Sequence, residues 1–425
     1  MKEVLFHYGK TMVGHSFDEQ QLAGVLTSSI EHYTPAAGES ELVQAAMENP
    51  VGSAKLSELA KGKEKVVIIA SDHTRPVPSK HIIPHMLRQI REGNPNAQIT
   101  ILIATGCHRG TTKEELIDKF GEEIVRNENI YVHDCLEREK LVNIGTLPSG
   151  GVCEINSIAY EADLLVAEGF IEPHFFAGFS GGRKSILPGI AGRDTVLANH
   201  CSEFVASPKA RTGILEGNPI HQDMVWAARA AKLVYIVNVV LNAEKKVIFA
   251  TAGDTVEAHK AGTDFLMGLC KTKAIPADIV ISTNGGYPLD QNVYQAVKGM
   301  TAAEATVKKD GVIIMLARSD DGIGGDHFYH QLADEPDIRK TTELFLSRSR
   351  NQTEPDQWQV QVLLRILAHA KVIYISDLED SLVEQLHMIP AKSIAEALEK
   401  AKTLVSEKEL KIVAIPDGIS VVVEA

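Results

Sequence analysis

The sequence has few cysteines, and none of them has the spacing of a structural site. It contains five, an odd number, at scattered positions and without any C-x-x-C pair. This pattern excludes a disulfide framework and a structural zinc site, and we expect the thiols to be reduced. Cys107 and Cys201 each adjoin a histidine, so a soft-metal ligand is the alternative to the favoured interpretation, a small buried hydrophobic residue.

Long apolar runs and basic tracts are missing as well. No hydrophobic stretch approaches the roughly 20 residues that span a bilayer, and the first residues, MKEVLFHYGK, contain no long apolar core. The 43 basic residues are outnumbered by 56 acidic ones, and no Lys/Arg run is interleaved with aromatics. We therefore expect a cytoplasmic protein that binds neither a membrane nor nucleic acid.

Short β-branched runs alternate with amphipathic segments, which predicts an α/β protein with largely parallel sheets flanked by helices. Strands are expected at 66–70, at 99–104 and in ADLLVAEGF, with a helix in HIIPHMLRQIREG and another capped by Thr111 or Thr112. The stretch AKLVYIVNVVLNAEKKVIFATAG predicts an antiparallel hairpin that turns at 242–246.

The length of 425 residues favours two domains of unequal size. A change from a helical segment to a new strand around KTKAIPAD puts the expected boundary between residues 1–272 and residues 273–425. The last apolar segment, ISVVVEA, could return to the first domain.

Polar side chains follow three consecutive predicted strands of the first domain. Ligands of open α/β sheets bind beyond the carboxyl ends of the strands, so this clustering predicts a site there. Each residue also has a simpler interpretation: a turn acceptor, a surface cation or a solvated imidazole. The cluster consists of Asp72, His73, Arg75, His108, Arg109, Glu172 and His174.

The stretch HFFAGFSGGRKSILPG resembles a phosphate-binding loop but breaks its pattern. The motif G-x-x-x-x-G-K-[ST] requires glycine where Arg183 stands, which disfavours a P-loop phosphotransferase and leaves Lys184 unexplained. Further on, His200 lies in the last turn of a predicted helix, where a histidine either binds a metal or interacts favourably with the helix dipole.

The second half offers another glycine loop before a helix, in STNGGYPLDQNVYQAVKGM. Tyr294 and Lys298 are four residues apart and share one helix face, as a site pair or as an ordinary exposed pair. The stretch GIGGDH fails as a dinucleotide fingerprint because His327 occupies the third glycine position.

At SDHTRPVPS, GCHRG, EPHFFAGFSGGRKSILPGIAG, ANH and NGGYPLDQNVYQAVKGMTAAEAT, the chain resembles the nickel-dependent lactate racemase family. The resemblance implies that Lys184 carries a nickel pincer nucleotide, pyridinium-3-thioamide-5-thiocarboxylic acid mononucleotide, and that His200 is the protein ligand to nickel. It implies His108 and His174 as paired acid/base residues and Arg75 as the partner of the substrate carboxylate. Further site residues by the same resemblance are Asp72, Gly181, Gly182, Tyr294, Gln295, Lys298 and Trp358.

The same resemblance implies an isomerase that interconverts D- and L-lactate by hydride transfer through pyruvate. The first domain would be the cofactor-binding and catalytic one, the second would close over an active site in the interdomain cleft, and separate cofactor-synthesis proteins would be needed for maturation. Hydride transfer fits the residues because no pair of bases is arranged to remove a proton from carbon. The alternatives are racemisation or epimerisation of another 2-hydroxy acid, such as malate, phenyllactate or a sugar acid, and a non-catalytic nucleotide- or metal-binding protein.

Overall fold

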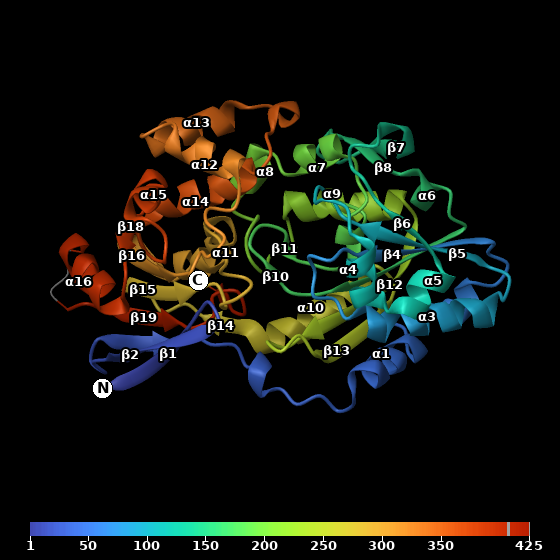
Figure 1. The fold of residues 1–425 in the computed structure, drawn as a ribbon, viewed down its shortest axis with the longest axis horizontal. Coiled ribbons are helices and arrows are strands. Elements are labelled where there is room, and N and C mark those ends of the chain that lie inside the picture. Colours follow the sequence, from blue (N-terminus) through green and yellow to red (C-terminus); the bar gives the residue numbers. More distant parts are fainter. Residues whose placement is uncertain (406–408, 425) are drawn as a thin grey trace. The chain divides into compact units, whose positions relative to one another are not determined.

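The protein is described by a computed structural model that covers residues 1–405 and 409–424, and the chain forms two compact units (Figure 1). Unit 1 comprises Met1–Ser29, Cys201–Ala206 and the chain from Leu269 onward, and unit 2 comprises Ile30–His200 and Ser207–Gly268. Each unit holds a six-stranded, largely parallel sheet flanked by helices. The α/β fold class predicted from the sequence is confirmed.

Unit 2 is built on a sheet with the strand order β13-β12-β9-β4-β5-β6. All neighbours are parallel except β12 and β13, which form the predicted antiparallel hairpin. The strands are β4 (Lys65–Ser71), β5 (Gln98–Ala104), β6 (Asn129–Val132), β9 (Leu164–Phe170), β12 (Leu233–Leu241) and β13 (Val247–Gly253). Two antiparallel pairs lie outside this sheet: β7 (Leu141–Thr146) with β8 (Val152–Asn156), and β10 (Pro173–His174) with β11 (Gly178–Phe179).

The helices of unit 2 cover this sheet. They are α1 (Glu39–Glu48), α2 (Leu56–Leu59), α3 (Ser79–Gly93), α4 (Lys113–Phe120), α5 (Glu122–Asn127), α6 (Ser157–Tyr160), α7 (Arg193–Asn199), α9 (Pro219–Ala230), α10 (Glu257–Cys270), which runs past Gly268, and the 3₁₀ helices η1 (Ile30–His32), η2 (Arg138–Lys140) and η3 (Gly182–Ser185). Helices α1 and α3 share a buried core with alternate strand residues, such as Met47, Met86, Ile68, Ile101 and Val237. Thr112 caps α4, and Glu115 completes the predicted capping box.

Unit 1 contains an all-parallel sheet with the order β18-β17-β16-β15-β19-β3. Its strands are β3 (Leu22–Val25), β15 (Ala277–Thr283), β16 (Val307–Leu316), β17 (Lys371–Ile375), β18 (Ile389–Ala391) and β19 (Ile412–Ile415). An antiparallel hairpin of β1 (Lys2–Tyr8) and β2 (Thr11–Phe17) and a parallel pair of β14 (Lys271–Lys273) and β20 (Val422–Glu424) complete its strands.

Helices flank the sheet of unit 1 on both faces. They are α8 (Ser202–Ala206), α11 (Val293–Glu304), α12 (Asp326–Ala333), α13 (Ile338–Ser347), α14 (Gln357–His369), α15 (Asp380–Gln385), α16 (Ile394–Leu404) and the 3₁₀ helix η4 (Arg350–Gln352). The hairpin and α16 share one core with alternate strand residues, including Phe6, Ile281, Ile314 and Ala397. On the opposite face Ser282 donates to the carbonyl of Gly299 at 2.9 Å, so α11 lies directly against β15.

The N-terminal segment joins a sheet far away in sequence. Residues 1–29 were expected in the first domain, whereas β3 pairs with β19 and brings Met1–Ser29 into unit 1. A four-residue strand carries little sequence signal, and pairing across such a long separation is decided by packing. The last described strand, β20, pairs with β14 in the same unit, and the division at residue 272 stays a prediction.

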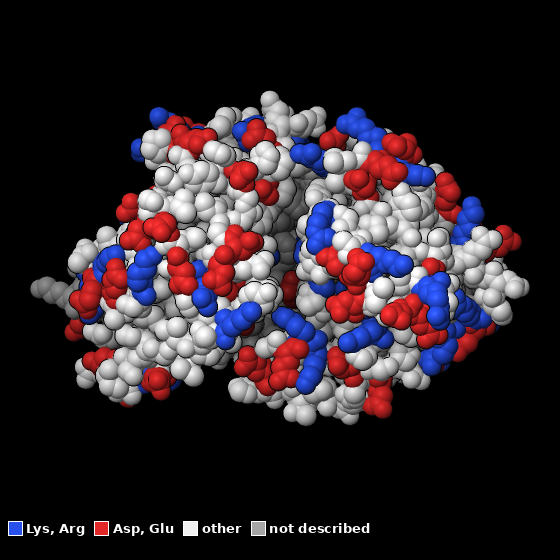
Figure 2. All heavy atoms as spheres, viewed as in Figure 1, with Lys and Arg blue, Asp and Glu red and all other residues white. Residues whose placement is uncertain are grey.

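Cys201 is buried, as predicted, but Cys107 is exposed, so its interpretation as a buried hydrophobic residue is wrong. It lies in the loop after β5, which opens at the edge of the sheet. Basic and acidic side chains are interspersed over the surface that Figure 2 shows. Within the described part of the chain, no helix has the length and apolar character needed to cross a membrane.

Candidate active site

Three adjacent strands of unit 2 carry predicted site residues beyond their carboxyl ends. Strands β9, β4 and β5 are neighbours in the sheet, and the segments that follow them contain His174, Asp72 and His108, respectively. Parallel strands end at one edge, so the sheet order itself brings these side chains to a common side.

His108 is bound to a buried carboxylate. Its Nδ1 lies 2.7 Å from Oδ2 of Asp72, a side chain that is 1% exposed. Thr74 donates to the other carboxylate oxygen from its backbone N–H at 3.2 Å and its hydroxyl at 2.7 Å. Burial by itself raises the pKa of Asp72, but the hydrogen bonds from His108 and Thr74 outweigh it and lower the pKa below its ordinary value. An ionised Asp72 accepts the Nδ1 hydrogen, so neutral His108 presents a lone pair at Nε2.

Arg75 lies on the exposed part of the same loop. Its guanidinium donates to the Thr74 hydroxyl at 2.9 Å. The backbone of the loop is held from α4, because Lys119 donates to the carbonyls of Arg75 at 3.1 Å and Val77 at 3.2 Å. Lys119 thus fixes the backbone of the loop, while the side chain of Arg75 is exposed to solvent.

His174 has the opposite hydrogen-bond arrangement. Its Nδ1 accepts the backbone N–H of Ala177 at 3.2 Å and, at 3.5 Å, that of Phe176. A ring nitrogen that accepts carries no hydrogen, so neutral His174 has its hydrogen on Nε2. The two predicted acid/base residues are therefore set as opposite tautomers, one with a lone pair and one with a hydrogen at Nε2.

Phe176 is the common neighbour of three predicted site residues. Its ring centroid lies 4.5 Å from that of His174 and 5.3 Å from that of His200, and Nζ of Lys184 lies 6.0 Å from it. The side chain is 3% exposed and was not predicted from the sequence, because an isolated phenylalanine looks like any core residue. It brings the predicted anchor and the predicted metal ligand close together.

His200 is buried at the C-terminal end of α7. Its Nδ1–H donates to the carbonyl of Val196 at 2.9 Å, so the neutral ring presents a lone pair at Nε2. Burial and, after it, the positive charge of Lys184 lower the pKa of His200 to about 3. A neutral imidazole whose other nitrogen is fixed by a backbone carbonyl is the usual state of a metal-binding histidine.

A double-glycine turn leads into the short helix η3 that contains Lys184. Gly181 and Gly182 have φ values of +78° and +51°, a region that L-residues with side chains disfavour. A Cβ on Gly182 would lie 3.0 Å from the ring of His259, and its N–H donates to Oδ1 of Asn238 at 2.8 Å. The close approach that the glycines allow is therefore to Asn238 and His259, and their contact with a cofactor stays a prediction.

The predicted residues of unit 1 lie on two helices. Tyr294, Gln295 and Lys298 are on α11, whose N-cap Asn292 accepts the N–H of Gln295 at 2.9 Å. Trp358, at the start of α14, donates from Nε1 to the hydroxyl of Tyr294 at 3.2 Å. Tyr294 and Trp358 are thus in direct contact, and the four-residue spacing places Lys298 one turn along the same helix face.

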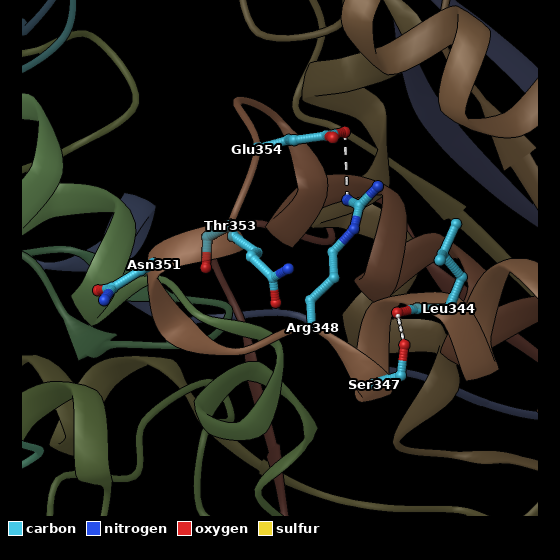
Figure 3. Close-up of a pocket in the computed structure, with 7 residues that line it drawn as sticks. Leu344, Ser347, Arg348, Asn351, Thr353 and Glu354 are labelled. Atoms are coloured by element: carbon cyan, nitrogen blue, oxygen red, sulfur yellow. Dashed lines mark hydrogen bonds and ion pairs between the residues drawn. The ribbon is translucent and has the colours of Figure 1, made fainter.

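A cavity of about 510 Å³ in unit 1 contains none of the predicted residues. In Figure 3 the ion pair of Arg348 with Glu354, 3.2 Å apart, faces this cavity. It is lined by Leu344, Ser347, Arg348, Asn351, Gln352, Thr353 and Glu354.

Comparison with known proteins identifies the family. Residues 8–213 match the model for the lactate racemase N-terminal domain, and residues 272–423 match that for the lactate racemase C-terminal domain. The chain belongs to the lactate racemase family. Membership makes it an enzyme, an isomerase.

Two relatives in the lactate racemase family match nearly the whole chain. The lactate racemase of Lactiplantibacillus plantarum is 54% identical over 418 residues, 98% of each chain. That of Thermoanaerobacterium thermosaccharolyticum is 51% identical over 424 residues, covering 100% of this chain and 99% of the relative.

Solved structures give the same result. The lactate racemase apoprotein from T. thermosaccharolyticum superposes with a TM-score of 0.96 at 50% identity over 100% of both chains. A protein from Thermotoga maritima, 18% identical, has a TM-score of 0.65 over 92% of this chain and 100% of its own, a likeness of fold alone.

Proposed function

We propose that this protein interconverts D- and L-lactate by hydride transfer, with a nickel pincer nucleotide attached to Lys184. The observation that carries the proposal is the opposite hydrogen bonding of His108 and His174 at adjacent strand ends. A reaction that works on both enantiomers needs a proton acceptor and a proton donor, and at Nε2 neutral His108 presents a lone pair whereas neutral His174 presents an N–H group. The two relatives named lactate racemase support lactate as the substrate.

The residues of unit 2 fit the proposed cofactor. A covalent cofactor requires an amine, and Lys184 lies beside Phe176 together with His200. Nickel with soft donors requires few protein ligands, and the neutral His200 ring supplies one nitrogen. Among the described residues no group of three His, Cys, Asp or Glu side chains could hold a metal, so the remaining donors would come from the cofactor.

When bound, the cofactor would supply a site that accepts a hydride from C2 of lactate and returns it to pyruvate. The residues of the chain do the rest. Arg75 would hold the carboxylate with its guanidinium fork, which pairs well with two oxygens. His108 would take the hydroxyl proton at Nε2, and the resulting imidazolium would be stabilised by the ionised Asp72.

His174 would return a proton to the carbonyl oxygen of pyruvate from Nε2 in its doubly protonated form, because a neutral ring that lost its Nε2 hydrogen would become an imidazolate. In the opposite direction the neutral ring would act as the base with its lone pair at Nε2. Both forms carry a hydrogen on Nδ1, so the contact with the Ala177 amide would have to open for either role. We propose smaller contributions from Tyr294, Gln295, Lys298 and Trp358 in unit 1 and from Asp72, Gly181 and Gly182 in unit 2. We also propose maturation by cofactor-synthesis proteins and a cytoplasmic location.

The decisive experiment uses protein co-produced with the cofactor-making enzymes. We expect an intact mass that shows an adduct on Lys184, bound nickel and racemisation of lactate. Lys184→Ala should lose the adduct and the activity, while Lys209→Ala, an exposed lysine of the same unit, should keep both. Racemisation without any adduct would refute the assignment of Lys184.

Deuterium at C2 of lactate tests the hydride step separately. We expect the deuterium to be retained in the product, because a hydride does not exchange with water. Complete exchange with solvent before product release would refute hydride transfer. A panel of 2-hydroxy acids in the same assay identifies the preferred substrate.

A further inference from the structure

Arg183, next to Lys184 in the chain, is a buried cation with a shell of neutral partners. Its side chain is 2% exposed, and none of the ion pairs among the described residues includes it. Nε donates to Nδ1 of His221 at 3.0 Å, Nη1 to the carbonyls of Ser180 and Gly181, both at 3.1 Å, and Nη2 to that of Ala177 at 2.9 Å. Burial lowers the pKa of Arg183 to about 9, so the guanidinium stays charged at neutral pH.

The two histidines around Arg183 are neutral, and the tautomer of His221 follows from its partner. His221 accepts at Nδ1 and so carries its hydrogen at Nε2. Nε2 of His259 lies 2.8 Å from the Ser180 carbonyl, which only accepts, and 3.1 Å from Nη1 of Arg183, which only donates, so these two contacts favour opposite tautomers of His259. Burial, and after it the charge of Arg183, lowers the pKa of His221 to about 3 and that of His259 well below its usual value. The guanidinium is thus held by three backbone carbonyls and a neutral histidine ring. Burying a positive charge among neutral partners costs free energy, so we expect this arrangement to have a function in the neighbouring site.

Ala177 connects this guanidinium to the candidate acid/base residue. Its carbonyl accepts from Arg183, and its N–H donates to Nδ1 of His174. The carbonyls of Ser180 and Gly181, which Arg183 also holds, belong to the turn that leads into η3 and Lys184. One side chain therefore fixes both the amide that faces His174 and the backbone that precedes Lys184.

We propose that Arg183 is a positioning residue that holds the Ala177 amide on Nδ1 of His174 and so keeps the hydrogen of that ring at Nε2. The inference rests on the proposed function for the role of His174, but the geometry concerns the apoprotein alone. It also gives a reason for arginine at the place where a P-loop has glycine: the side chain turns inward and occupies the interior of the loop.

The test is the ¹⁵N spectrum of the histidine rings in the apoprotein, together with hydrogen exchange of the Ala177 amide. In the wild type we expect the Nε2–H tautomer for His174 and the Nδ1–H tautomer for His108, whose hydrogen is fixed by Asp72. Arg183→Met should give a mixture of tautomers at His174, leave His108 unchanged and speed exchange at Ala177 by roughly tenfold or more. Arg183→Lys, which keeps the charge without the planar fork, should fall between the two.

Exposed Arg229 in α9 of the same unit provides the matched control, and Arg229→Met should change neither signal. If Arg183→Met lowers stability but leaves the His174 tautomer and the Ala177 exchange rate as in the wild type, Arg183 is only a packing residue. If Arg183→Met does not fold, the inference is tested on Arg183→Lys and on the wild type. An Nδ1–H tautomer of His174 in the wild-type spectrum would overturn it. Failure of the loaded enzyme to racemise lactate would refute the proposed function and leave this result untouched.

Discussion

At the scale of single residues, the contact with Asp72 makes His108 chemically different from His174, so the two histidines of the site are not equivalent. The carboxylate is almost fully buried, receives hydrogen bonds on both oxygens and stays ionised. A fixed anion beside one imidazole stabilises its protonated form, while the backbone amide at His174 disfavours protonation at that nitrogen. The two rings are therefore chemically unequal although both follow neighbouring strands.

Asp72→Asn tests this inequality. The amide keeps the shape of the carboxylate but no longer stabilises a positively charged His108, so we expect kcat of the loaded enzyme to fall roughly 100-fold with little change in KM. Asp334→Asn is the matched control, since Asp334 and His330 form an exposed pair with a distance of 3.2 Å. Equal losses in both variants would contradict the assignment.

At the scale of elements, the turn before η3 depends on glycine for two separate reasons. Gly182 has a positive φ and also lies against the ring of His259, where a Cβ would be 3.0 Å away. Gly62, in the same unit, has a φ of +70°, and a Cβ added there would meet no heavy atom within 4 Å. Comparing the two positions separates backbone strain from crowding.

We expect Gly62→Ala to lower the free energy of unfolding by about 1 kcal/mol, the usual cost of a left-handed residue with a side chain. Gly182→Ala should cost about 1–3 kcal/mol more, because the added methyl group displaces His259 in a packed interior. Urea unfolding of the two apoprotein variants measures both values. Equal costs would show that His259 moves aside without penalty and that the turn is less rigid than its contacts indicate.

At the scale of the whole molecule, several buried histidines of unit 2 make stability depend on pH. Burial lowers the pKa of His133, and burial with a neighbouring positive charge lowers the pKa values of His200, His221 and His259, to about 3 for His200 and His221. In the unfolded chain these rings titrate near 6.5. Below that pH the unfolded state binds more protons, so stability is complete above about pH 6.5 and is lost as the pH falls toward the folded-state values.

The pH dependence of urea unfolding checks this expectation between about pH 4 and pH 7. Removing one such ring should reduce the slope of the free energy of unfolding by about 1.4 kcal/mol per pH unit in the middle of that window. His259→Gln is suitable because the amide can either donate to the Ser180 carbonyl or accept from Nη1 of Arg183. Exposed His330→Gln should leave the slope unchanged, and an unchanged slope in His259→Gln would show that His259 is protonated in the folded protein.

The sequence by itself determined strands such as β4, β5 and β9, the hairpin of β12 and β13, and a helix capped by Thr111 or Thr112, because each depends on local periodicity or on residues a few positions apart. It also indicated that Asp72, His108 and His174 share one edge, since the carboxyl ends of parallel strands must. Only the tertiary structure decided that β3 joins unit 1, that Asp72 binds His108, that Phe176 lies beside both Lys184 and His200, and that Arg183 points inward. No local sequence pattern links the residues that these contacts join, so the contacts are determined by packing and hydrogen-bond geometry.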